Sequence, residues 1–260
     1  MSSDKADPPR LVRWRRPPGP VNVWRIVDGE ETLDDGSKRP VRLSIQEVPE
    51  ERREEALQLM IKHFLADEPI CKCYGVKDDP KYTHDFVLLW KYVMENHRIV
   101  EAAYKIDSDG RISDLAAVNV LYVEWEGTDA ELELLTKKMQ SDKFMRTLNA
   151  MLELSHKADA RKIFGVDKYL SALGLCVAPR FRGKKLGLRM LEARNEIGQK
   201  YEIPVSSTIF TATASQILAE RAGYKVEYAQ DYADFKAEDG TALFPNIETK
   251  EIKVMMKALY

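Results

Sequence analysis

A nearly continuous apolar run from Tyr169 to Val177 most constrains how this chain can fold. The run has the length of one strand, and an apolar strand without alternation is typical of a strand covered on both faces. It leads into the basic, glycine-containing loop 178–187 and then into a helix with apolar positions such as Leu186, Met190 and Ile197. This segment predicts a central strand with helices packed against the sheet.

Strand-like and helix-like segments alternate through the rest of the chain, which predicts an α/β layered fold with one mixed sheet. Pro49 is typical of a helix start. That helix should end near Pro69, because proline disfavours helical geometry in the residue before it. Further strands are expected at 41–45, 98–106, 115–125, 205–210, from 224 onward and at 251–258, and further helices at 82–96, 130–161 and 214–222.

The first 22 residues differ in composition from the rest of the chain. Five of the twelve prolines precede Val21, with arginines between them, and such a segment can neither pair regularly nor bury much surface. We predict a flexible Pro/Arg-rich arm over residues 1–22 and one domain over residues 23–260. A proline-rich docking ligand is the alternative interpretation of the arm.

Charge and cysteine content argue against several classes of function. The 40 basic and 42 acidic residues leave a net charge of −2, which gives no overall attraction to nucleic acid or an anionic membrane. Cys71, Cys73 and Cys176 have neither zinc-site spacing nor the pattern of a disulfide framework. No stretch approaches the roughly 20 apolar residues that span a bilayer, and the start lacks a signal-peptide core. We expect no metal, nucleic acid or membrane partner and a cytoplasmic location, while a nuclear location fits the same absences.

The loop after the central strand is a candidate anion site. A helix N-terminus presents unpaired N–H groups and the positive end of the helix dipole, so a loop with small residues there can hold a phosphate. Arg182, Lys184 and Lys185 add positive charge at this point. The loop lacks GxxxxGK[ST] and the three glycines of a dinucleotide fingerprint. An exposed basic helix start is the alternative interpretation.

The segment Val177-x-Pro179-x-x-Arg182-Gly183-x-x-Leu186-Gly187 closely resembles the pyrophosphate loop of the GNAT acyltransferase superfamily, whose core is R/Q-x-x-G-x-G/A. Arg182 fills the first position of that core and Gly187 the last. Lys185 stands where the family usually has glycine. The resemblance implies a GNAT-like, mixed, mostly antiparallel central sheet flanked by helices, with acetyl-CoA or another acyl-CoA as co-substrate.

Two further segments resemble insect arylalkylamine N-acetyltransferases. The first is Phe64-Leu65-x-Asp67-Glu68-Pro69-Ile70-Cys71, and the second is Ala222-Gly223-Tyr224 followed by Tyr232-Ala233-Asp234-Phe235. With the loop, the similarity extends from about Trp24 to the C-terminus. It implies direct acetyl transfer, in a ternary complex, to a small amine such as serotonin, dopamine, tryptamine or octopamine.

The resemblance also implies a role for individual residues. The main chain of Leu175, Cys176 and Val177 should hold the pantetheine arm as an added strand would be held. The pyrophosphate should be wrapped by the amides of Arg182, Gly183, Lys184, Lys185, Leu186, Gly187 and Leu188. Glu68 matches the glutamate regarded as the general base. Ser215 matches a serine near the thioester sulfur, and Thr211 matches a second hydroxyl residue one helical turn earlier.

The chemistry of amine acylation requires groups of this kind. A primary amine with a pKa of about 10 is protonated at neutral pH, so a base must remove a proton before the nitrogen attacks. Asp67 is the alternative base. Ser215, which we expect to protonate the leaving thiolate, could instead cap the following helix. Ala219 occupies the position at which many GNAT enzymes have a tyrosine that acts as a general acid.

Several alternatives stay open at this point. Tyr74, Tyr82, Phe86 and Trp90 could form an aromatic wall for the acceptor, or could simply be core residues. The acceptor could be an aliphatic amine or polyamine. A catalytically silent acyl-CoA-binding or scaffold protein is the alternative from a different class of function, and it is motivated by Lys185 and Ala219. The sequence indicates no particular protein partner.

Overall fold

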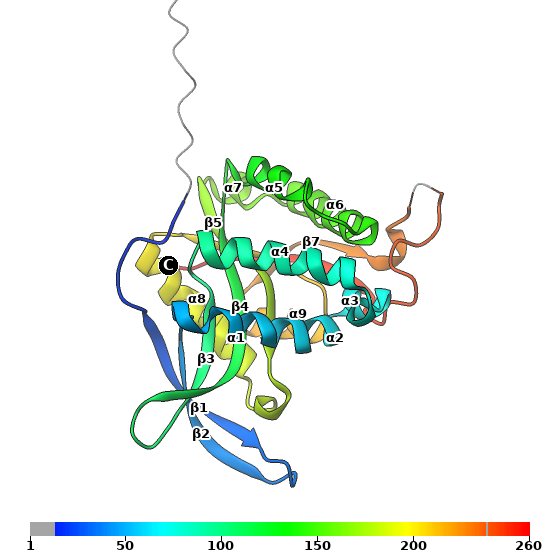
Figure 1. Cartoon of the computed structure of the whole chain (residues 1–260). Helices are drawn as coiled ribbons and strands as arrows, with labels where there is room; N and C mark the ends of the chain where they lie inside the picture. Colours follow the sequence, from blue (N-terminus) through cyan, green and yellow to red (C-terminus); the bar gives the residue numbers. More distant parts are fainter. Residues whose placement is uncertain (1–13, 238) are drawn as a thin grey trace, which may run out of the picture.

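The computed structural model describes residues 14–237 and 239–260, and within them eight strands form one sheet in the order β1-β2-β3-β4-β5-β6-β8-β7 (Figure 1). The strands are β1 Val23–Thr32, β2 Lys38–Glu47, β3 Glu101–Ile106, β4 Ile112–Trp125, β5 Lys168–Val177, β6 Val205–Phe210, β7 Lys225–Asp231 and β8 Glu251–Ala258. Only the β5–β6 pair is parallel. The expected mixed, mostly antiparallel sheet is therefore confirmed.

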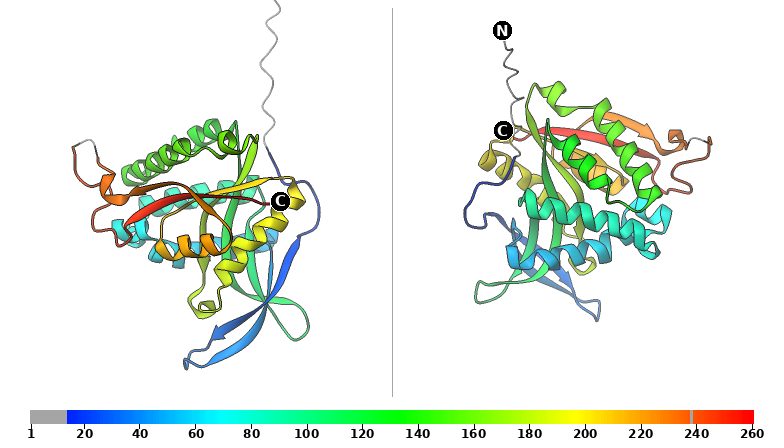
Figure 2. Two further views of the ribbon diagram at one scale, coloured as in Figure 1. Left: turned by 180° about the vertical axis from the view of Figure 1, so that it is seen from behind. Right: turned by 45° about the horizontal axis from the view of Figure 1, so that its top comes forward.

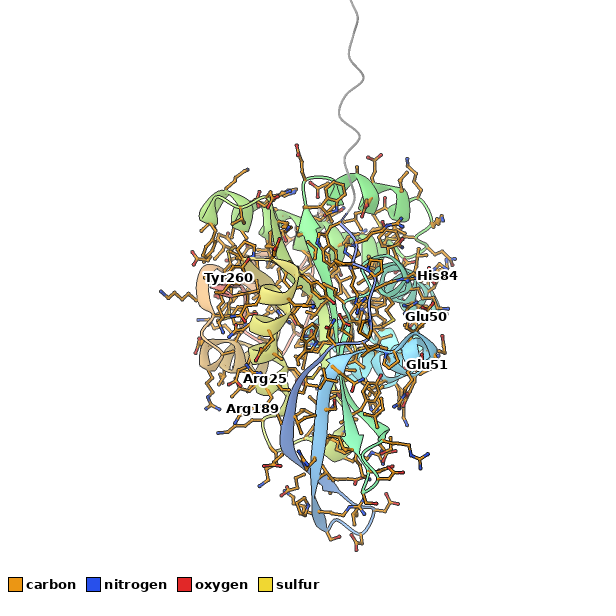
Figure 3. The ribbon with its side chains drawn as sticks, turned by 90° about the vertical axis from the view of Figure 1, so that its left-hand side faces the viewer. Arg25, Glu50, Glu51, His84, Arg189 and Tyr260 are labelled. Carbon is orange, nitrogen blue, oxygen red and sulfur yellow. The ribbon has the colours of Figure 1, made fainter. Side chains whose placement is uncertain are left out.

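Helices cover both faces of the sheet. They are α1 Arg53–Leu59, α2 Leu65–Asp67, α3 Pro69–Tyr74, α4 Pro80–Asn96, α5 Thr128–Thr136, α6 Asp142–Lys157, α7 Ala160–Phe164, α8 Leu186–Tyr201 and α9 Thr213–Arg221. Helices α1 and α4 lie on one face, and α8 and α9 lie on the other, as the view from behind shows (Figure 2). Seen along the sheet, Arg25 and Arg189 lie on the α8 side, and Glu50, Glu51 and His84 lie on the opposite side (Figure 3).

The sheet opens between β5 and β6. Within the described residues these strands pair in parallel at a single position, Leu170 with Ser206. Beyond that position β5 continues to pair with β4, and β6 continues to pair with β8. The edge of β5 that faces β6 therefore has no strand partner over its second half, and the two strands diverge around a gap that a ligand can fill.

The helix that starts near Pro49 is less regular than the sequence predicts. A π-helical turn over Met60–Phe64 interrupts it before α2 ends at Asp67, next to the expected stop. The chain then starts α3 at Pro69, with Glu68 as the N-cap residue. The region 130–161, in which one or two helices are expected from the sequence, contains three helices, α5 to α7. No membrane-spanning candidate occurs among the described helices, since none combines the required length and apolarity.

The predicted arm over residues 1–22 lies partly outside the described residues, which begin at Trp14. From there the chain contacts the body of the molecule. The ring of Trp14 stacks on His97 at 6.2 Å between centroids, and Arg16 forms a salt bridge of 2.7 Å with the buried Glu47. The part of the arm nearest the domain is therefore attached to it.

Candidate functional site

One elongated cavity of about 600 Å³ follows the gap between β5 and β6. Most of the residues selected from the sequence line it, namely Glu68, Leu175, Cys176, Val177, Arg182, Gly183, Lys185, Leu186, Gly187, Thr211 and Ser215. Two selected residues lie outside the lining. Lys184 forms an ion pair with Glu30 at 3.3 Å, and Leu188 is buried in a cluster with Leu191 and Phe210.

The strand β5 carries a bulge at the centre of the cavity. Leu175 lies opposite Asn119 and Ala172 opposite Leu121, so β5 has one extra residue over this interval. Gly174 adopts a φ of +124°, and an added Cβ would lie 2.7 Å from the ring of Phe64. Glycine is therefore required here by its backbone conformation and by the close approach of this ring.

The N-terminus of α8 leaves its first amides available to a ligand. Lys185 is the N-cap residue, and no side chain caps the helix. Its φ of 58° and ψ of 28° lie in the left-handed region, which glycine adopts readily and lysine does not. Lys185 thus holds a backbone conformation that a glycine would adopt without strain. The unpaired amides and the helix dipole favour an anion here.

Arg182 connects this loop to the end of α2. Its Nε donates to the carbonyl oxygen of Val177 at 2.9 Å, and its Nη2 donates to Asp67 Oδ2 at 2.6 Å. Asp67 is therefore already paired with a guanidinium, which makes it a weaker candidate for the base than Glu68. This contact holds the predicted anion site next to the end of α2, directly before the predicted base, Glu68.

Glu68 has one engaged and one available oxygen. Oε2 accepts a hydrogen bond of 2.7 Å from the amide of Cys71, which caps α3. Oε1 is buried and has no hydrogen-bond partner among the described residues. A buried carboxylate oxygen without a partner is costly, and this one belongs to a side chain that lines the cavity. It can accept a proton or a hydrogen bond from a bound amine.

Ser215 and Thr211 approach the cavity from the opposite side of the gap. Ser215 lies in the first turn of α9, and its hydroxyl donates to the carbonyl oxygen of Ala212 at 2.8 Å. It does not accept an amide hydrogen bond as a cap, because α9 has no side-chain cap. Thr211 lies between β6 and α9, and its carbonyl oxygen accepts a bond of 3.0 Å from the hydroxyl of Tyr232. Both residues closely follow β6, the strand that diverges from β5.

The cysteine in the cavity has no nucleophilic role at neutral pH. Cys176 is buried, and burial raises the pKa of its thiol to about 12. A thiol with this pKa stays protonated, whereas the thiolate is the nucleophile.

Beyond Glu68 the cavity continues between α4, α5 and α6. Tyr82 and Phe86, both on α4, line it. Tyr74 and Trp90 do not, and the indole N–H of the fully buried Trp90 instead donates to the carbonyl oxygen of Leu173 at 2.9 Å. Half of the expected aromatic wall is thus positioned for an acceptor, and the other half supports the helix and the bulged strand.

Sequence reasoning missed several charged residues of the lining, and Glu124 and Arg194 are two of them. Arg194 on α8 is 1% exposed and donates to Thr208 Oγ1 at 2.8 Å and to Asn119 Oδ1 at 3.2 Å, so it connects β6 to β4. Glu124 lies near the end of β4, opposite Tyr169. A carboxylate directly after the apolar run Val120–Val123 was the available signal for Glu124.

No protein-family model matches the chain, and no curated protein matches it in sequence. Its structure is similar to that of the "insect putative arylalkylamine N-Acetyltransferase 7" from the yellow fever mosquito, with a TM-score of 0.82 and 25% identity over 95% of this chain and 100% of that chain. For arylalkylamine N-acetyltransferase 2 from Aedes aegypti the TM-score is 0.71, at 22% identity over 84% and 99% of the two chains.

A polyamine N-acetyltransferase from Drosophila melanogaster is also similar, with a TM-score of 0.67 and 18% identity over 83% of this chain and 99% of that chain. The structural neighbours of this chain thus include insect arylalkylamine N-acetyltransferases, and its architecture is that of the GNAT fold. The resemblance found in the loop and in the two other segments is confirmed at this level.

Proposed function

We propose that the protein transfers an acetyl group from acetyl-CoA to the primary amine of a small molecule, directly and in a ternary complex. One observation carries this proposal. A single cavity joins the uncapped N-terminus of α8 and the unpaired edge of β5 to the available carboxylate oxygen of Glu68. An anionic donor and an amine acceptor can therefore meet inside one cavity.

The donor would lie along β5 and the loop. Leu175, Cys176 and Val177 belong to the half of β5 without a partner on the β6 side, so their main chain can pair with the amides of a pantetheine arm. The diphosphate would lie at the loop amides, with Arg182 and Lys185 nearby. Lys184 would act on it only through its charge, because its side chain lies outside the cavity lining.

In the transfer the nitrogen must lose two protons and the leaving sulfur must gain one, and the cavity has groups that can accept and donate them. Oε1 of Glu68 would take a proton from the ammonium of the acceptor, and the freed nitrogen would attack the thioester carbonyl. A main-chain N–H of β5 near Cys176 would stabilise the charge on the carbonyl oxygen. As the carbon–sulfur bond breaks, the hydroxyl of Ser215 would turn from the Ala212 carbonyl and protonate the thiolate, with Thr211 nearby as a second hydroxyl. The second proton of the attacking nitrogen would return to the Ser215 oxygen, and Glu68 would release the first proton to solvent, which leaves a neutral amide and a free thiol.

Two acceptor classes have support. The rings of Tyr82 and Phe86 and the names of the similar mosquito structures support an arylalkylamine. An aliphatic diamine or polyamine is the second candidate, and it is favoured by carboxylates at the far end of the cavity. The cytoplasmic location stays a prediction.

The test combines binding and turnover. Calorimetry with coenzyme A should show binding, and incubation with acetyl-CoA and a panel of arylalkylamines and diamines should release free thiol. Coenzyme binding without thiol release for any amine would favour the catalytically silent alternative. The absence of coenzyme binding would refute the proposal as a whole.

A further inference from the structure

The charged residues that line the cavity differ between its two ends. At the loop they include Lys185 and the Arg182–Asp67 ion pair, and at the other end four carboxylates, of Glu124, Asp129, Glu131 and Asp159, lie with the single guanidinium of Arg161. The acidic end lies near α5, α6 and α7, at the opposite end of β5 from the loop (Figure 1). An anionic group is expected at the first end and a cationic group at the second.

Glu124 is a carboxylate at this end that has no direct ion pair within the described residues. Asp159 is neutralised by Arg161, with contacts of 3.1 and 3.2 Å, and Asp129 lies 3.8 Å from His156. In the described part of the chain, no salt bridge involves Glu124. The hydroxyl of Tyr122 forms a hydrogen bond with it, and Arg161 attracts it only through space. A charge in this position is costly until a cation pairs with it.

Glu124 lies far along the sheet from the level of Leu175, where the acetyl group would be transferred. Leu175 pairs with Asn119, five positions before Glu124 on β4. At about 3.3 Å per residue this corresponds to roughly 17 Å between the two levels of the sheet. Between them lie apolar side chains of the lining, including Leu132, Leu148 and Met151. An acceptor that reaches Glu124 therefore needs an extended apolar middle and a polar far end.

We propose that Glu124 binds a second, positively charged nitrogen at the far end of the acceptor, so that extended diamines bind better than monoamines of equal length. This inference rests on the proposed acetyl transfer, and it identifies Glu124 as the residue that selects among its acceptors. The transferred nitrogen would lie at Glu68, and the second nitrogen would lie at Glu124, among the side chains of Tyr122, Tyr169 and Ser171.

The charge state of Glu124 sets the assay conditions. Burial raises the pKa of Glu124 to about 7, with Asp129 and Asp159 adding to the rise and Tyr122 and Arg161 opposing it. The carboxylate is therefore ionised at pH 8 and largely protonated at pH 6. The preference for a diamine should be greatest at pH 8 and should fall as the pH falls through 7.

The experiment compares 1,10-diaminodecane with decylamine at pH 8 and saturating acetyl-CoA, using the full chain. For the wild type we expect the KM of the diamine to be at least tenfold lower. Glu124→Gln, which has nearly the same shape without the charge, should raise the KM of the diamine at least tenfold and leave the KM of decylamine within twofold of the wild-type value. Glu126→Gln removes a neighbouring exposed charge outside this cavity and should change neither KM.

Three results would overturn the proposal. The first is an equal change for both amines in Glu124→Gln, and the second is an equal effect in Glu126→Gln. The third is a rise in KM in Glu124→Gln that affects tyramine and leaves both phenethylamine and the diamine unchanged. This result would show that Glu124 binds a neutral hydroxyl group and not a second cation. If no amine is acetylated, the proposed function fails separately. Calorimetric titration of 1,10-diaminodecane and decylamine into the wild type and Glu124→Gln then decides whether Glu124 binds the second cation.

Discussion

Replacing Glu68 by glutamine tests the base assignment sharply, because glutamine can keep the structural role of this side chain and cannot take the proton. In the structure Oε2 of Glu68 accepts the amide of Cys71 at 2.7 Å and caps the six-residue helix α3. A glutamine oxygen can accept the same bond. Glu68→Ala removes the cap as well, which costs about 1 kcal/mol of stability.

The expected loss of activity is much larger than the effect of the cap. A general base typically contributes 10²- to 10⁴-fold to the rate, which corresponds to about 3–5 kcal/mol of activation free energy. We therefore expect kcat to fall at least a hundredfold in both variants, while only Glu68→Ala loses measurable stability. Initial rates of thiol release give kcat, and urea unfolding gives the free energy of unfolding.

Asp67→Asn provides the comparison that can refute this reasoning. It removes the adjacent carboxylate and breaks the exposed ion pair with Arg182, a contact worth at most about 1 kcal/mol. We expect a higher KM for acetyl-CoA and a kcat close to that of the wild type. Wild-type kcat in Glu68→Gln, or a greater loss of kcat in Asp67→Asn than in Glu68→Gln, would show that Glu68 is not the base.

Three other substitutions test the structure around the cavity. Lys185→Gly should raise the free energy of unfolding by up to about 1 kcal/mol, because glycine adopts the left-handed backbone conformation of this residue without strain. The same variant should bind coenzyme A more weakly in calorimetry, because a cation is lost. A lower free energy of unfolding in the variant would contradict the first expectation. Burial raises the pKa of Glu101 from 4.5 to about 8, so this carboxyl group keeps its proton in the folded protein and loses it in the unfolded chain between these pH values. The free energy of unfolding of the wild type therefore falls by about 1.4 kcal/mol for each pH unit in this range. Glu101→Gln should equal the wild type near pH 4.5 and gain on it by about 3 kcal/mol at pH 7, and parallel curves in urea unfolding would refute the assignment. Gly174→Ala should lose roughly 1–3 kcal/mol from its φ of +124° alone, with a further loss from contact with Phe64, and a wild-type melting temperature would be inconsistent with the bulge.

Local sequence was sufficient for the order and type of most elements. The strand over Tyr169–Val177, the helix that begins at Leu186 and the helix stop before Pro69 follow from apolar periodicity, turn residues and proline, which act over a few neighbouring positions. The loop between the first two was an anion-site candidate for the same reason. Short-range signals missed the π-helical turn at Met60–Phe64 and the helix α3, because packing against the sheet overrides weak local preference there.

The tertiary structure alone decided how these elements form a site. The ion pairs of Arg182 with Asp67 and of Lys184 with Glu30 join residues that are far apart in the chain. Only the assembled sheet shows that β5 and β6 separate and that the cavity between them reaches Glu124. Sequence periodicity records which side of an element is buried. It does not record which distant element lies against that side, and the geometry of the cavity depends on those long-range contacts.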